Sequence, residues 1–374
     1  MFRLRHTILI LIAAISLTLS SCAPPEPIRI GFLGGLSGWS PELGIDGLHG
    51  ARLAVELRNK AGGIKGRQIE LIEADDQQDT ETARQSIARL IEHKVAAVVG
   101  PMTSAMAIAT VPLSNQSQLL MVSPTATSND LSGQDDYFFR VVPATRQYVK
   151  TSADFYYSAW GLRNLRLVYD LRNRSYTESW LRDFSSAFAK AGGKLLEPIN
   201  FTSSDEVVFS SLARQALSEN PDGIIIIANS VDTAMLCESI RKLNSSIAIG
   251  AAEWASTGRL IELGGKSVEG IAVEHFFDQQ STQPSYIAFR DAYAKRFGQD
   301  PGFGGLYTFD ATNVILDAME KKTPDQSLKQ TLLAQKTFAG TQRPVTFDAT
   351  GDSEGGTFIF IVKDGAFDPV RTVP

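Results

Sequence analysis

Short apolar strands and amphipathic helices alternate along this chain, and the alternation occurs twice in the same order. The expected strands are Ile28–Leu33, Ile69–Ile72, Val95–Val99, Leu119–Val122, Leu165–Tyr169, Leu195–Phe201, Gly223–Ala228 and Ile247–Gly250. The helices expected between them are Gly47–Asn59, Thr80–Glu92, Ser104–Ser114, Glu178–Lys190, Val207–Leu217 and Asp232–Leu243. Such alternation is typical of parallel sheets with helices on both faces. A chain of 374 residues has the length of about two domains, so we expect an α/β fold of two doubly wound, parallel-sheet lobes.

The loops that follow the strands are the expected place for a ligand. In open parallel sheets, ligands bind outside the carboxyl ends of the strands, and two such lobes that face one another leave a crevice between them. The loops in question are Gly34–Leu43, Gly100–Ser104, Ser123–Thr127, Asp170–Tyr176, Asn229–Asp232 and Ala251–Ser256. The sequence therefore predicts a binding site between the two lobes.

Hydroxyl groups dominate two of these loops in the first half. Ser104 begins an expected helix, where unpaired N–H groups and a partial positive charge favour an anion such as a carboxylate. A role as the N-cap of that helix explains Ser104 equally well. Thr125 and Thr127 follow the next strand and add further donors, although an ordinary Ser/Thr turn is the alternative.

The second half offers an acid and aromatic side chains. Glu253 follows an expected strand, and a carboxylate at a strand end in a crevice suits an ammonium group, whereas a solvated surface glutamate is the alternative. Tyr176 and Trp254 also lie after strands, as does Trp39 in the first half. These three aromatic residues are candidates for the walls of a pocket, with core or rim packing as the alternative.

Composition and motifs argue against several other classes of protein. The chain has 41 acidic and 36 basic residues and no dense basic run, which disfavours a nucleic-acid binder. Two cysteines and four scattered histidines give neither a disulfide framework nor a metal site. The P-loop motif requires a glycine at the position of Leu260, so the sequence does not match it. The nucleophile-elbow motif of hydrolases requires a glycine at the position of Trp39, so it is not matched either. We therefore expect no cofactor, no metal and no enzymatic activity.

The first residues have the features of an export signal. Arg3 and Arg5 precede the apolar run Ile8–Leu19, which is too short for a permanent membrane span and is typical of a signal peptide over residues 1–21. The run ends at Leu19-Ser20-Ser21-Cys22, which resembles a bacterial lipobox with Cys22 as the lipidated residue. Residues 22–27 then form a Pro-rich tether. We expect an exported protein that is anchored to a membrane through Cys22.

Several stretches of the chain together resemble periplasmic binding proteins of the leucine/isoleucine/valine-binding type. They read IGFLGGLSG, HGARLAVELRNKAGGIKGRQIELIEADDQQD, VAAVVGPMTS, MVSPTATS and FGQDPGFGGLYTFDA. The resemblance implies a type I periplasmic-binding fold, in which three crossing segments form a hinge. It also implies a first lobe of residues 28–144 with about 276–345, and a second lobe of residues 145–275 with about 346–374.

The resemblance assigns ligand contacts to three residues of the first lobe. It implies that Ser104 receives a ligand carboxylate through its hydroxyl and amide groups. The amide of Thr127 is expected at the same carboxylate and its hydroxyl at the ammonium group, while the carbonyl of Thr125 accepts from the ammonium group.

In the second lobe, the resemblance implies that Glu253 pairs with the ammonium group and that Tyr176 closes over the ligand. Asn229 or Ser230 falls where an aromatic residue is often found. Leu43 replaces the aromatic residue near the entrance, with Trp39 close by, so the walls differ from those of a branched-chain amino acid site.

The function that the resemblance implies is capture of a small molecule. We expect a monomer that binds an amino acid or a related carboxylate and delivers it to the permease subunits of an ABC importer. The alternative is a ligand-sensing module for a regulator or receptor, without transport. An exported enzyme would need a nucleophile and a base in the crevice, and the sequence shows no such pair.

Overall fold

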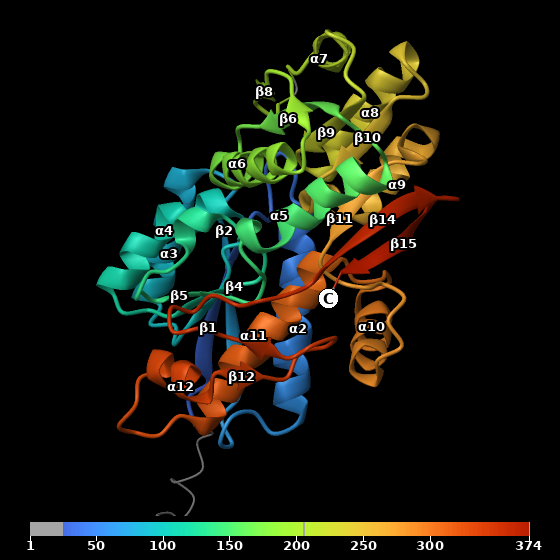
Figure 1. The fold of residues 1–374 in the computed structure, drawn as a ribbon. Coiled ribbons are helices and arrows are strands. Elements are labelled where there is room, and N and C mark those ends of the chain that lie inside the picture. Colours follow the sequence, from blue (N-terminus) through green and yellow to red (C-terminus); the bar gives the residue numbers. More distant parts are fainter. Residues whose placement is uncertain (1–24, 205, 374) are drawn as a thin grey trace, which may run out of the picture.

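The computed structural model describes residues 25–204 and 206–373, and its strands form two main sheets, one above the other in Figure 1. The first sheet has five parallel strands in the order β2-β1-β3-β4-β5. Their bounds are Ile28–Gly34 for β1, Ile69–Asp75 for β2, Val98–Val99 for β3, Met121–Ser123 for β4 and Phe138–Arg140 for β5. We call this sheet and the helices packed on it the first lobe.

The second sheet has eight strands in the order β15-β14-β11-β10-β9-β6-β7, with β8 also paired to β6. Their bounds are Asn164–Asp170 for β6, Lys194–Leu195 for β7, Ile199–Phe201 for β8, Gly223–Ile227 for β9, Ala248–Ala251 for β10, Ala272–His275 for β11, Thr357–Lys363 for β14 and Ala366–Val373 for β15. Strands β6 to β11 are parallel, whereas β14 and β15 are antiparallel. This sheet and its helices make the second lobe.

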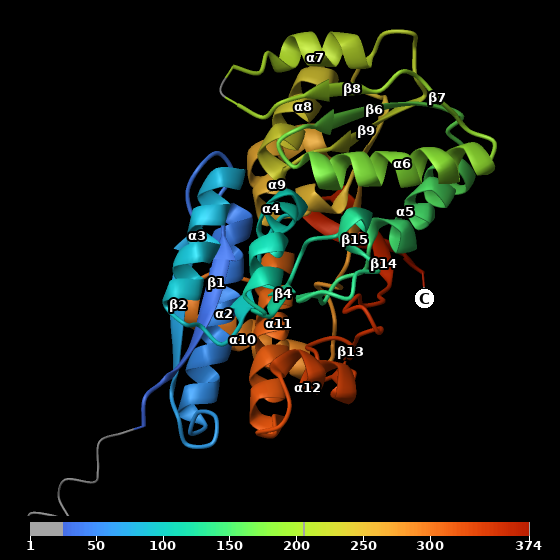
Figure 2. The ribbon, with the colours of Figure 1, turned by 90° about the vertical axis from the view of Figure 1, so that its left-hand side faces the viewer.

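Helices cover both sheets, as Figures 1 and 2 show. Their bounds are Glu42–Lys60 for α2, Thr80–Glu92 for α3, Ser104–Gln116 for α4, Thr145–Asp154 for α5, Arg174–Lys190 for α6, Phe209–Ala216 for α7, Ser230–Leu243 for α8, Gly258–Gly264 for α9, Pro284–Phe297 for α10, Phe303–Lys321 for α11 and Leu328–Gln335 for α12. The predicted α/β class with two doubly wound lobes is confirmed. The antiparallel pair β14–β15 is an addition to the predicted parallel sheet, at the edge where such strands are common.

Local sequence explains where the elements begin and end. Helix α3 has the predicted bounds because the Asp79 side chain accepts from the amide of Thr82 at its start. The predicted strand Leu195–Phe201 is split into β7 and β8 around Pro198, which has no N–H group to donate. Helix α6 begins at Arg174, so Tyr176 lies in its first turn rather than in the loop that precedes it.

Helix α11 returns to the first lobe and packs closely on α2. A Cβ atom on Gly50 would lie 2.1 Å from the carbonyl oxygen of Gly305, so only glycine permits this approach. The amide of Gly305 also donates to the Asp46 carboxylate at 2.6 Å, and the Tyr293 hydroxyl of α10 donates to the same carboxylate at 2.6 Å. Contacts between residues this far apart in sequence hold α10 and α11 in the first lobe.

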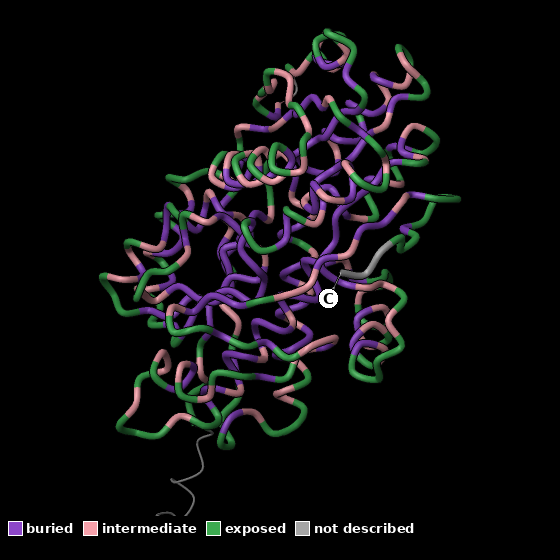
Figure 3. The backbone as a smooth tube through the Cα atoms, in the orientation of Figure 1, coloured by how far each residue is buried: buried purple, intermediate pink, exposed green. Residues whose placement is uncertain are grey.

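The chain passes between the lobes three times, after β5, after β11 and after the short strands β12 (Thr337–Phe338) and β13 (Val345–Thr346). Figure 3 shows buried backbone in both sheets and in the crossing region between them. The crossings agree with a three-segment hinge. The lobe limits given above as residue numbers stay a prediction, and the predicted signal peptide and Cys22 lie outside the described residues.

Candidate functional site

A small cavity lies where loops of both lobes meet. Its volume is about 20 Å³, which is room for about one water molecule. From the first lobe it is lined by Leu43, Met102, Thr103, Ser104, Thr125 and Phe303, and from the second lobe and the crossing after β11 by Asn173, Tyr176, Glu253, Trp254 and Phe276. Five of the predicted site residues are therefore brought together: Ser104, Thr125, Tyr176, Glu253 and Trp254.

The first lobe contributes the start of α4. The Ser104 hydroxyl oxygen accepts from the backbone amides of Thr127 and Ser128, each at 3.1 Å. Because that oxygen accepts twice, its proton remains available to donate, and it has no acceptor among the described residues. The Thr125 hydroxyl donates to the Met102 carbonyl, which ties the loop after β4 to the loop before α4. The start of α4 thus presents a hydroxyl donor to the cavity.

Asn173 of the second lobe reaches across to this helix. Its side-chain oxygen accepts from the backbone amide of Ala105 at 3.1 Å. A carbonyl oxygen at a helix N-terminus occupies the position that suits a carboxylate oxygen. The contact therefore links the two lobes through an acceptor that stands where an anion would bind.

Glu253 lies on the opposite side, in the short 3₁₀ turn Glu253–Ala255. One of its oxygens, Oε1, accepts from the Tyr148 hydroxyl at 2.8 Å. The other oxygen, Oε2, and the hydroxyl of Tyr176 are buried without a well-formed hydrogen bond among the described residues. The Glu253 side chain forms no ion pair in the described part of the chain. Burial raises the pKa of this carboxyl group.

Aromatic and apolar side chains form the remaining walls. The rings of Tyr176 and Trp254 meet edge to face, with centroids 5.9 Å apart. Phe276, Phe303 and Met102 complete this apolar surface. The site therefore combines neutral donors, one acid and an apolar wall.

Three predicted site residues do not line the cavity. Thr127 is buried behind Ser104, and its hydroxyl oxygen lies 3.4 Å from the Tyr148 hydroxyl. The Asn229 side chain caps α8, since its oxygen accepts from the amide of Asp232 and its nitrogen donates to the carboxylate of the same residue. Trp39 is half-buried in the loop between β1 and α2. Ser230 donates to Glu42 at 2.6 Å and so makes a second contact between the lobes.

Several residues of the site were not predicted. Asn173 lies in the loop Asp170–Tyr176, which follows a predicted strand, so its position at the expected binding crevice could have been predicted from the sequence. Tyr148 lies on α5, Phe276 directly follows β11, and Phe303 begins α11. The alternation of strands and helices in the sequence does not place these segments relative to the crevice. Glu274, a carboxylate inside the apolar strand β11, was detectable as an exception to its surroundings.

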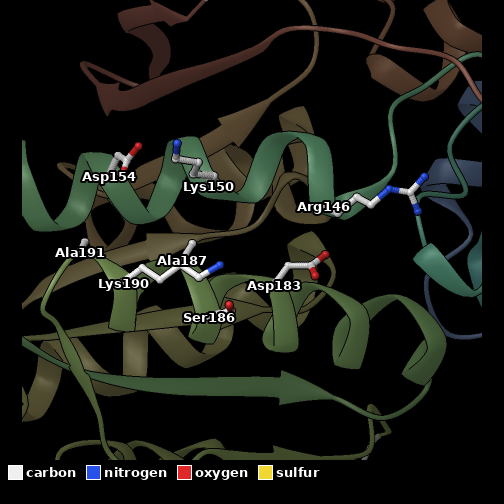
Figure 4. Close-up of a pocket in the computed structure, with 8 residues that line it drawn as sticks. All are labelled: Arg146, Lys150, Asp154, Asp183, Ser186, Ala187, Lys190 and Ala191. Carbon is white, nitrogen blue, oxygen red and sulfur yellow. The ribbon is translucent and has the colours of Figure 1, made fainter.

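A second hollow, of about 490 Å³, lies on the surface between α5 and α6 (Figure 4). Arg146 and Lys150 project from α5, and Asp183 and Lys190 from α6. Charges of both signs line it, and no predicted site residue does. It therefore shows no preference for a ligand of one charge.

Neither metal nor membrane features occur in the described ranges. Within residues 25–204 and 206–373, no three His, Cys, Asp or Glu side chains form a group suited to a metal ion. None of the helices described there combines the length and the apolar character of a membrane span. Cys237 is free and fully buried, and burial raises the pKa of its thiol to about 12, which makes it a poor nucleophile.

Comparison with solved structures identifies the fold. The leucine-binding protein LivK of Thermotoga maritima matches with a TM-score of 0.85 at 24% identity, over 92% of this chain and 98% of that one. A solute-binding protein of an ABC transporter from Rhodopseudomonas palustris, solved with 3,4-dihydroxybenzoic acid, matches with a TM-score of 0.83 at 18% identity, over 93% and 97%. Both matches show the type I periplasmic-binding fold.

Comparison of sequences identifies the family. The Leu/Ile/Val-binding protein of Escherichia coli is 22% identical over 353 residues, which cover 93% of this chain and 94% of the relative. The Leu/Ile/Val-binding protein BraC3 of Rhizobium johnstonii is 26% identical over 339 residues, which cover 88% of this chain and 90% of the relative. The model of the periplasmic binding protein family matches residues 27–366. The chain therefore belongs to the periplasmic binding protein family, and the relatives and solved structures that match it include leucine- and Leu/Ile/Val-binding proteins.

Proposed function

We propose that this protein binds an α-amino acid between its lobes and delivers it to an ABC importer. The observation that carries the proposal is the pairing of two incomplete groups across the cavity. A hydroxyl proton without an acceptor lies at the start of α4, and a carboxylate oxygen without a donor lies on Glu253. An α-amino acid supplies the missing carboxylate and the missing ammonium group together.

The charge of Glu253 also discriminates between ligand classes. The same fold occurs in a solute-binding protein solved with an aromatic acid, 3,4-dihydroxybenzoic acid. A ligand that brings a carboxylate but no cation leaves Glu253 buried without a charged partner, which is unfavourable. We therefore favour an amino acid over a benzoate, with the apolar wall of Trp254, Phe276 and Phe303 receiving its side chain.

Entry of a ligand requires the lobes to separate. The cavity of about 20 Å³ is far smaller than the roughly 300 Å³ or more of typical small-molecule sites. The contacts of Asn173 with Ala105 and of Ser230 with Glu42 join the lobes in this arrangement. We propose that these contacts break when the lobes separate, and that bound ligand shifts the population towards a closed state whose cavity is wide enough to hold it.

The remaining parts of the proposal concern location and partners. The family implies an extracytoplasmic location and binding of a solute without its conversion. We propose that Cys22 is lipidated, that the protein works as a monomer, and that the closed form is recognised by a permease. Mass spectrometry of the mature N-terminus tests the lipid anchor, and a diacylated Cys22 is the expected result.

Binding is tested by calorimetry with a panel of L-amino acids, benzoate and 3,4-dihydroxybenzoate. We expect at least one amino acid to bind in the micromolar range or tighter. Ser104→Ala and Glu253→Gln each remove a charge-assisted hydrogen bond, worth about 1.5–3 kcal/mol, so each is expected to weaken binding about 10- to 100-fold. Ser117→Ala, at the exposed other end of α4, and Glu262→Gln, on the exposed face of α9, are controls that leave affinity unchanged. Tight binding of benzoate with no amino acid bound would contradict the proposal.

A further inference from the structure

A groove of about 550 Å³ lies at the end of the first lobe that faces away from the second lobe. The parallel strands of the first lobe point their carboxyl ends towards the cavity, so the amino end of β1 lies at the opposite end of the lobe. The described chain begins there, at the lower end of the first lobe in Figure 2. The start of the chain lines this groove together with the turns that follow α2 and α3 and the end of α11.

Basic side chains dominate this groove. Of its described lining residues one is acidic and five are basic, namely Arg29, Lys65, Arg67, Lys94 and Lys322. The whole chain, by contrast, carries a formal net charge of -5. The groove, which we call the basic groove, is therefore a local concentration of positive charge on an acidic protein.

Most of these positive charges lack a counter-ion. Arg29 pairs with Glu70 at 2.9 Å, and the two side chains are 50% and 46% exposed. The other four basic side chains form no ion pair within residues 25–204 and 206–373. The carboxyl ends of α2, α3 and α11 lie nearby, and each helix end carries a partial negative charge of about half an elementary charge. Three partial charges and the one lining acid, Glu26, leave an excess of positive charge in the groove.

The start of the described chain is fixed to the basic groove. Arg67 Nε donates to the carbonyl of Glu26 at 2.9 Å, and the amide of Ile28 donates to the carbonyl of Gln68 at 2.8 Å. Cys22 precedes Glu26 by four residues, so the covalent chain keeps the two within about 14 Å of one another. A lipid on Cys22 would therefore hold the basic groove close to the membrane surface, at a distance comparable with the Debye length of about 10 Å at 0.1 M salt.

The remaining lining residues of the basic groove are mostly apolar, and they include Ile28, Ile64, Met319 and Pro324. A groove that combines cations with apolar side chains suits a phospholipid headgroup, because the phosphate of the headgroup is joined to a less polar glycerol unit. Each Lys or Arg near an anionic membrane surface strengthens binding by about fivefold. Four unpaired cations together therefore give a substantial preference for an anionic membrane over a neutral one.

We propose that the basic groove docks the first lobe on an anionic phospholipid membrane, with lipid phosphates beside Lys65, Arg67, Lys94 and Lys322. The second lobe then stays clear of the bilayer and is free to move when the crevice opens. This role goes beyond the proposed ligand binding and does not depend on it. The proposed lipid on Cys22 supports the role, but the two are tested separately.

The test measures how far a membrane protects the lysines of the groove. The natural protein, with its N-terminus as purified, is added to preformed vesicles of phosphatidylcholine alone or of phosphatidylcholine and phosphatidylglycerol in equal parts. Brief acetylation with acetic anhydride, an uncharged reagent, is followed by mass spectrometry. We expect Lys65, Lys94 and Lys322 to react at least about fivefold more slowly on the anionic vesicles, relative to the exposed Lys363 on β14 of the second lobe.

The protection should disappear at about 1 M salt, where the Debye length is about 3 Å. Equal reaction rates on the two kinds of vesicle at low salt overturn the inference. Flotation of the protein with neutral vesicles reports the lipid anchor separately, so an anchored protein with unprotected lysines refutes the docking and leaves the anchor intact.

Inorganic phosphate distinguishes a membrane from a soluble anion. With phosphatidylcholine vesicles, added phosphate is expected to leave the rates at Lys65, Lys94 and Lys322 unchanged, because a single small anion does not cover the whole groove. Protection by phosphate on neutral vesicles would assign the groove to a soluble anion and overturn the membrane docking.

Charge-reversal variants separate the groove from the net charge of the protein. Lys94→Glu combined with Lys322→Glu is expected to make Lys65 react equally fast on both kinds of vesicle. Lys242→Glu combined with Lys295→Glu changes the net charge by the same amount at exposed positions of α8 and α10 and should keep the protection of Lys65. Equal loss of protection in both double variants would show that net charge rather than the groove attracts the membrane, which contradicts the proposal.

Discussion

The strongest test of the hinge is removal of the acid that pairs with Arg140. Arg140 lies on β5 and is fully buried, and its Nε donates to Oδ1 of Asp352 at 2.8 Å. The remaining guanidinium nitrogens donate to the carbonyls of Ala126 and Ser128 and to the hydroxyl of Ser132. Asp352 lies in the last crossing between the lobes, so this single side chain connects the crossing to the loop that flanks the ligand site.

Asp352→Ala leaves the guanidinium group buried without its counter-ion. Breaking a buried pair in this way costs about 3–5 kcal/mol, and the backbone acceptors of Arg140 compensate no charge. Arg146 provides the matched control, because it contacts the other oxygen of the same carboxylate at 3.6 Å while its side chain is 48% exposed. Arg146→Ala is expected to cost less than about 1 kcal/mol, as exposed ion pairs do.

The assay is urea unfolding at pH 7, followed by tryptophan fluorescence and circular dichroism. We expect the urea concentration at the unfolding midpoint to fall sharply for Asp352→Ala and hardly at all for Arg146→Ala. The dependence of the unfolding free energy on urea concentration should change little in either variant. Arg140→Met combined with Asp352→Leu should cost less than Asp352→Ala alone, because no charge is then left unpaired. Equal small costs for Asp352→Ala and Arg146→Ala would refute the reasoning.

Three further predictions follow from buried groups and close contacts. Burial raises the pKa of Asp310 to about 7, so the folded state holds a proton that the unfolded state has released. Unfolding free energy should therefore fall by about 3 kcal/mol between pH 5 and pH 8 through this group. The fall should be smaller by that amount in Asp310→Asn, because other buried acids such as Asp76, whose pKa burial raises to about 7, keep their contribution; parallel urea profiles for the two proteins would contradict it. Gly50→Ala should cost about 3 kcal/mol because of the clash with Gly305, whereas Gly258→Ala, with no atom within 4 Å, should cost less than about 1 kcal/mol; similar melting temperatures for both variants would count against close packing of α2 and α11. Ser230→Ala removes a contact with Glu42 and should increase the radius of gyration of the ligand-free protein in X-ray scattering; an unchanged radius would show that this contact does not hold the lobes together.

The sequence predicted most elements of the fold because local signals and the hydrophobic pattern agree there. Helix α3 combines an N-cap at Asp79 with buried Ala83, Ile87 and Leu90 on one face. The prediction of a single strand over Leu195–Phe201 was wrong, because Pro198 has no N–H group and interrupts the hydrogen bonding to β6. Strands β14 and β15 were not predicted, because they follow no strand–helix alternation.

The site was predictable where a residue follows a parallel strand directly. Ser104, Thr125 and Glu253 meet at the cavity because the carboxyl ends of parallel strands converge there. Asn229 also follows such a strand, but its side chain satisfies the amides of its own helix instead. Sequence position alone does not decide between these two uses of a polar side chain. Phe276 reaches the cavity from the crossing after β11 and Phe303 from the start of α11, and only the tertiary structure locates these two segments.

Neither lobe is a continuous stretch of chain, and this affects how a nascent polypeptide acquires its structure. Asp46 and Gly305 are 259 residues apart. The first lobe therefore cannot bind helix α11 until most of the chain has been synthesised. Strand β11 likewise remains an open edge, prone to aggregation, until β14 has been synthesised. Since such distant contacts form slowly, the two lobes are expected to fold together and late, and truncation before residue 357 should leave a chain that aggregates rather than a stable fragment.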